Sequence, residues 1–128
     1  LEKSEGVVCV VIDKNKDAHF ATNNGVKPLV NWLRNEPEIL KGASVADKVI
    51  GKAAAMLMVY GGVKEVYGGI VSESAAQFLS HSGITFTSGK KVPYIINRDK
   101  TGMCPMESRA QDLQTAEEAF RVFDEIVK

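Results

Sequence analysis

The longest apolar run in the chain, residues 53–60, places the strongest constraint on the fold. It is far too short to cross a bilayer, which takes about 20 residues, so we expect it to be buried inside a soluble domain. We predict one helix over residues 42–62, because Ser44 and Asp47 have the spacing of a capping box and apolar residues then recur at helical intervals. The second half of this helix is apolar on every side and should be largely buried.

The rest of the chain alternates between strand and helix patterns. The predicted strands are apolar segments bounded by turn residues, and they cover residues 7–12, 19–22, 63–71, 84–87 and 92–96. The other predicted helices begin near Pro28, at Ser72 or Ser74, and at Thr115, where Glu118 completes a capping box. Strands that alternate with helices predict an α/β fold, here a three-layer α/β/α sandwich with a mixed five-stranded sheet covered on both faces. The length predicts a single domain, residues 1–128.

Composition excludes several classes of protein. The chain carries 16 basic and 16 acidic residues, so its formal net charge is zero. A neutral chain has no long-range field to hold a polyanion, which argues against general nucleic-acid binding but leaves room for a local anion pocket. Cys9 in an apolar strand and the distant Cys104 do not make a disulfide framework, and no signal peptide is visible. We therefore expect a cytoplasmic protein with no membrane segment.

Four stretches carry a resemblance to a known family: residues 42–55 (GASVADKVIGKAAA), 60–63 (YGGV), 92–98 (VPYIINR) and 104–107 (CPME). Together with the order of elements, they resemble a small uncharacterised prokaryotic family with the cytidine-deaminase-like fold, known as a domain of unknown function. The resemblance implies a hairpin followed by strand–helix units around a mixed five-stranded sheet, and it implies no known activity.

Zinc deaminases need a His or Cys followed by a catalytic Glu at one helix start, and Pro-Cys-x-x-Cys at the next. In the predicted elements these places are taken by residues 44–48 (SVADK) and 71–76 (VSESAA), which contain no His or Cys. We therefore expect no metal, no cofactor and no deaminase reaction.

Our leading hypothesis is that the crevice binds a small anionic or nucleotide-like ligand beyond the carboxyl ends of the central strands. Asp47, Lys48 and Lys52 would form one stripe at the start of the predicted 42–62 helix. Two lysines four residues apart repel each other and oppose the helix dipole, and a bound anion would reverse both effects. Ser72 at a helix start and Arg98 in a polar loop would complete the site, although capping and solvation also explain these two residues.

Two alternatives remain open. In the first, Cys104 stands at a helix start where the dipole lowers the thiol pKa, and it acts as the nucleophile or redox group of an enzyme. Glu107, three residues later, is the second catalytic candidate, but its charge would oppose the thiolate. In the other alternative, the chain is a non-catalytic interaction or oligomerisation module, and side chains fill the old crevice.

Overall fold

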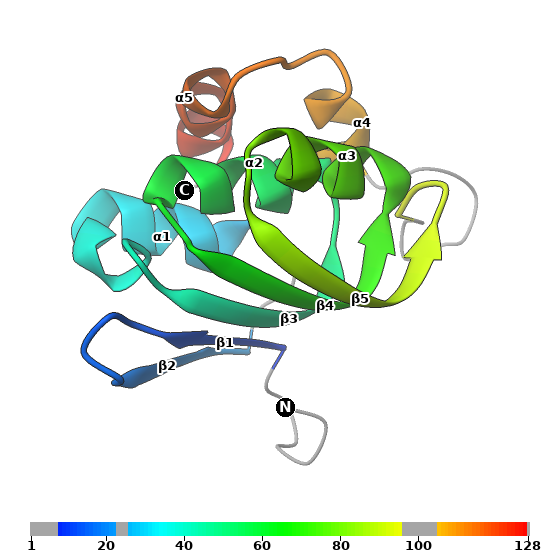
Figure 1. The fold of residues 1–128 in the computed structure, drawn as a ribbon. Helices are drawn as coiled ribbons and strands as arrows, with labels where there is room; N and C mark the ends of the chain where they lie inside the picture. Colours follow the sequence, from blue (N-terminus) through cyan, green and yellow to red (C-terminus); the bar gives the residue numbers. More distant parts are fainter. Residues whose placement is uncertain (1–7, 23–25, 96–104, 128) are drawn as a thin grey trace.

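A computed structural model describes residues 8–22, 26–95 and 105–127, and its centre is a five-stranded sheet (Figure 1). The strands are β1 (Cys9–Ile12), β2 (Ala18–Ala21), β3 (Ser44–Ile50), β4 (Glu65–Ser72) and β5 (Thr85–Val92). Their order across the sheet is β2-β1-β3-β4-β5. β1 is antiparallel to β2 and β3, whereas β3, β4 and β5 run parallel to one another. The predicted α/β class with a mixed five-stranded sheet is therefore confirmed.

The helices gather over one face of the sheet (Figure 1). They are α1 (Lys27–Asn35), α2 (Lys52–Gly61), α3 (Glu73–His81), α4 (Pro105–Ala110) and α5 (Ala116–Ile126), with a short 3-10 helix η1 (Pro37–Ile39) after α1. α2 connects β3 to β4, and α3 connects β4 to β5, so both connections step in the same direction across the sheet. Connections between parallel strands are almost always right-handed, which places both helices on the same face. α5 contacts α1 and α2 and lies outside them. In the described part of the chain the helices thus lie on one side of the sheet, so the expectation of helices on both faces is wrong there, although the mixed five-stranded sheet is as predicted.

The predicted helix over residues 42–62 is wrong in its first half. β3 occupies Ser44–Ile50, and α2 begins only at Lys52. β3 is a central strand that pairs with β1 on one side and β4 on the other, and this pairing outweighs the local helical pattern. Ser44 caps no helix; its hydroxyl instead donates a hydrogen bond to Glu65.

The other elements follow the sequence more closely. The hairpin of β1 and β2 is confirmed, as are the cap of α3 by Ser72 and the capping box of Thr115 and Glu118 at α5. β5, however, is one strand where we predicted two. Pairing with β4 keeps it extended, and a Cβ at Gly89 would lie 2.8 Å from the carbonyl oxygen of Gly69, so glycine is needed for the two strands to approach.

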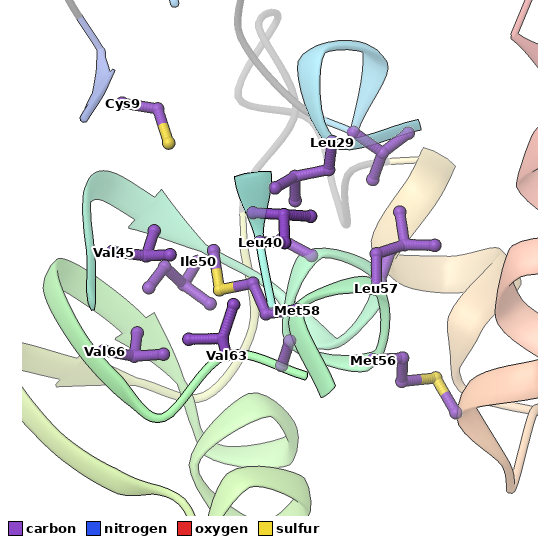
Figure 2. Packing of buried hydrophobic residues seen from close by; sticks show 14 of the residues in the cluster. Cys9, Leu29, Leu40, Val45, Ile50, Met56, Leu57, Met58, Val63 and Val66 are labelled. Atoms are coloured by element: carbon purple, nitrogen blue, oxygen red, sulfur yellow. The ribbon is translucent and has the colours of Figure 1, made fainter. Parts of the chain in front are cut away.

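The core lies between the sheet and the helices, with α2 at its centre. Met56, Leu57 and Met58 have no exposed surface, which confirms that this helix is buried. Figure 2 shows Met58 directed toward Ile50 of β3 and toward Val63, whereas Leu57 and Met56 point away from the sheet. α2 therefore packs on the sheet with one side and on other helices with the rest.

Candidate functional site

A carboxyl group from α4 occupies the N-terminus of α2. The Glu107 side chain is 2% exposed. Its Oε1 accepts a hydrogen bond from the backbone N–H of Lys52 at 2.6 Å, and its Oε2 accepts one from the N–H of Ile95 at 3.0 Å. The first N–H groups of a helix have no partner within the helix. The chain therefore places its own acceptor at the helix start, where our hypothesis would place a bound anion.

Gly51 makes this contact possible. It precedes α2 in an extended conformation, and a Cβ at this position would lie 3.1–3.2 Å from the carboxyl atoms of Glu107. Such a distance is tighter than ordinary van der Waals contact, so a side chain here would push the carboxyl group away. The pairing of Gly51 with Glu107 joins residues far apart in the sequence, and no local pattern indicates it.

A second set of polar groups continues from Glu107 toward the start of α3. The side-chain amide of Gln111 donates to the Glu107 carbonyl at 3.1 Å and to Ser74 Oγ at 3.3 Å. Lys52 Nζ donates to the Gln111 carbonyl at 3.3 Å. Ser72 Oγ lies 3.3 Å from Ser74 Oγ and accepts the N–H of Ala75. Three predicted residues, Lys52, Ser72 and Glu107, are thus brought together at the carboxyl ends of β3 and β4.

Gln111 and Ser74 join these three residues, and sequence reasoning did not single out either as a ligand contact. Within the described residues, every buried polar side-chain atom of the protein has a hydrogen-bond partner. The polar groups of the cluster therefore satisfy one another's hydrogen bonds, which is typical of a structural network as much as of a binding site.

Asp47 lies apart from this cluster, on the inner face of the sheet. Its side chain is 8% exposed, and its register partner on β1 is the buried Cys9. Burial raises the pKa of Asp47 to about 7, against the opposing effect of hydrogen bonds from the Val49 N–H and the Cys9 thiol. Burial and the neighbouring carboxyl group also raise the pKa of the Cys9 thiol. The helical stripe of Asp47, Lys48 and Lys52 does not exist, because alternation along β3 turns Asp47 inward.

The remaining predicted residues do not join the cluster. Lys48 is exposed on β3. Arg98 and Cys104 lie outside the described residues, so their roles stay predictions. Among residues 8–22, 26–95 and 105–127, no three His, Cys, Asp or Glu side chains are grouped so that they could hold a metal. No helix in these ranges has both the length and the apolar composition that crossing a membrane takes.

The outer face of the sheet, opposite the helices, is the largest feature that the sequence did not predict, and we call it the open face. Its large apolar side chains are strongly exposed: Phe20 60%, Val49 43%, Tyr67 43% and Ile70 39%. A shallow hollow of about 260 Å³ lies on it, lined by Val10, Ile12, Ser44, Val45, Ala46, Glu65, Val66, Tyr67, Thr85 and Thr87.

Comparison with known proteins identifies relatives by family and by fold. A family model described as "TM1506: Domain of unknown function (DUF1893)" matches residues 1–127. No curated protein matches the chain. The crystal structure of a DUF1893 family protein (TM1506) from Thermotoga maritima matches with a TM-score of 0.84 and 23% identity, over 94% of this chain and 80% of that chain.

The fold also matches that of RibD from Acinetobacter baumannii, with a TM-score of 0.50 and 18% identity. The match covers 92% of this chain and 33% of that chain, so the likeness concerns one part of a longer protein. At these identities both structures report on the fold alone. They agree with the deaminase-like architecture that the sequence predicted.

Proposed function

This chain belongs to the DUF1893 family, whose description assigns no activity, and we propose from its structure that it is a protein-interaction module. The observation that carries the proposal is the open face of the sheet. Parallel strands such as β3, β4 and β5 normally have both faces covered, whereas in the described residues the helices cover only the inner face. The outer face would be stabilised by a partner.

The exposed apolar residues of this face adjoin one another across the strands. Val49 pairs with Ile70 between β3 and β4, and Phe20 pairs with Val10 between β2 and β1. Single exposed apolar residues are ordinary, but contiguous apolar patches beyond a few hundred Å² mark interaction sites. Burying apolar surface is worth roughly 25 cal/mol per Å², so covering such a face supplies a substantial driving force for binding.

The crevice at the strand ends favours this proposal over an anion receptor. An anion that used the N-terminus of α2 would have to displace Glu107 from the N–H groups of Lys52 and Ile95. If Glu107 stays in place, the N–H of Lys52 at this helix start remains bonded to it and cannot hold the anion. The arrangement matches our alternative of a crevice filled by side chains.

A small polar ligand in the same crevice is the second candidate function. Its support is the convergence of Lys52, Ser74 and Gln111 at the carboxyl ends of parallel strands, where open α/β sheets bind ligands. Thermal unfolding with inorganic phosphate and with nucleotides tests it. A stabilisation that Lys52→Met removes would favour this candidate, and unchanged unfolding temperatures favour the interaction module.

Two isoleucines of equal exposure test the interaction module. Ile70 on the open face and Ile126 at the end of α5 are both 39% exposed. We expect the wild-type protein in an extract of its own cells to elute at a mass above that of the monomer. Ile70→Lys should shift it to the monomer mass, and the matched control Ile126→Lys should not. A monomeric wild type in the extract, or equal behaviour of the two variants, contradicts the proposal.

A further inference from the structure

We infer that the partner on the open face is a second copy of this chain, packed face to face with its strands antiparallel to the first. This inference deepens the proposed function and depends on it. It is drawn from the pattern of charge on the face and from the size of the face.

Three rows of outward side chains cross the parallel strands. The rows are Ser44–Glu65–Thr85, Ala46–Tyr67–Thr87 and Val49–Ile70–Lys90. The third row faces outward because the residues that follow Val49 and Ile70, which are Ile50 and Val71, are fully buried on the inner side. The face therefore carries an acid at one end and a base at the other, with an uncharged row between them.

This pattern is complementary to itself under one symmetry. A two-fold axis along the middle row lays the first row of one copy over the third row of the other. Glu65, on β4, then faces the end of the second copy where Lys90 lies on β5 and the exposed Lys48 on β3, the two strands that flank β4. Sheets pack about 10 Å apart, a gap that Glu and Lys side chains together can bridge. An axis along β4 would instead oppose Glu65 to Glu65 and place Lys90 over the end of β3 that carries Lys48, and both contacts between like charges are unfavourable.

The size of the face suits a small dimer interface. Three strands of seven or eight residues at about 4.8 Å spacing form a block roughly 14 Å wide and 25 Å long, and the two four-residue strands β1 and β2 add a strip of roughly 10 Å by 13 Å. The projected area of roughly 480 Å² is below the roughly 800 Å² that each partner contributes to a standard interface, so we expect a dimer that dissociates on dilution. The two-fold arrangement also closes, since each copy uses the same patch and leaves none free.

Sedimentation equilibrium on the purified protein tests the inference. We expect a monomer–dimer equilibrium in which Glu65→Lys raises the dissociation constant at least tenfold, because it puts like charges opposite Lys90 and Lys48. Adding Lys90→Glu to that variant should recover most of the loss, as the exchanged charges again attract. The matched control is Glu38→Lys, an exposed acid of η1 on the helix side, which makes the same change in net charge and should leave the constant unchanged.

Unfolding curves for each variant establish that the fold survives. A wild type that stays monomeric at millimolar concentration overturns the inference. So does a dimer that Glu65→Lys leaves intact, or one that the second exchange weakens further. If the pure protein is monomeric while the mass in the extract still depends on Ile70, the second copy is wrong and the interaction module stands. If neither effect is seen, both fail.

Discussion

Replacing Asp47 by Asn should raise the free energy of unfolding at neutral and alkaline pH and leave it unchanged at acidic pH. Asp47 is buried on the inner face of β3 beside the Cys9 thiol, and the pKa of its carboxyl group rises from the usual 3.8 to about 7. Asn has nearly the same shape, and its side-chain oxygen can still accept the Val49 N–H. The substitution therefore removes the cost of a buried charge and keeps the hydrogen bond.

The sign follows from proton binding. Between pH values near 4 and near 7 the folded state holds the Asp47 proton, whereas the unfolded chain releases it. The stability that this proton supplies is complete below the unfolded pKa and is lost as pH rises through the folded pKa. One pKa unit corresponds to about 1.4 kcal/mol, so a rise from 3.8 to about 7 sets an upper limit of about 4 kcal/mol.

Chemical denaturation at a series of pH values from about 4 to about 8 measures this effect, since that window spans the unfolded and folded pKa values. The free energy of unfolding of Asp47→Asn should equal that of the wild type at the acidic end and exceed it by up to about 4 kcal/mol at the alkaline end. Asp17→Asn, at an exposed acid in the hairpin, is the control and should differ little at any pH. A difference that is independent of pH, or a variant less stable than the wild type at high pH, would show that Asp47 is ionised and paired.

Further predictions concern the crevice and the core. Glu107→Ala leaves the N–H groups of Lys52 and Ile95 without an acceptor, at a cost of about 1–3 kcal/mol each. Formate should restore part of that stability in the variant but not in the wild type, with chloride as the control; equal effects of both salts would refute the role of Glu107. Leu57→Ala should cost roughly 2–5 kcal/mol by denaturation, because the side chain is fully buried in the core. The exposed Ile126→Ala should cost little, and a Leu57 effect below about 1 kcal/mol would place α2 outside the core.

The sequence predicted the elements whose signals are local. The capping box at Thr115 and the cap at Ser72 are set by neighbours within three residues, and both are confirmed. The burial of α2 also followed from its own composition, since a segment that is apolar on all sides has no solvent face.

What the sequence did not predict depends on distant partners. Residues Ser44–Ile50 read as the start of a helix, but pairing with β1 and β4 makes them a central strand. Glu107 was singled out for its effect on a cysteine, whereas its actual contacts are the N–H groups of Lys52 and Ile95, 55 and 12 residues away. The open face exists because the described helices all pack on the same face of the sheet. No residue pattern in the chain indicates which face a given helix covers.

The solvent exposure of Tyr67 in living cells tests the central claim most directly. Tyr67 on the open face and Tyr60 on α2 are 43% and 42% exposed, and Tyr60 stacks on Phe120 on the helix side. Treatment with tetranitromethane followed by mass spectrometry measures the nitration of each ring. In dilute purified protein we expect the two tyrosines to react to similar extents. In intact cells Tyr67 should be protected severalfold relative to Tyr60. Equal nitration of the two rings in cells would show that nothing covers the open face and would contradict the account.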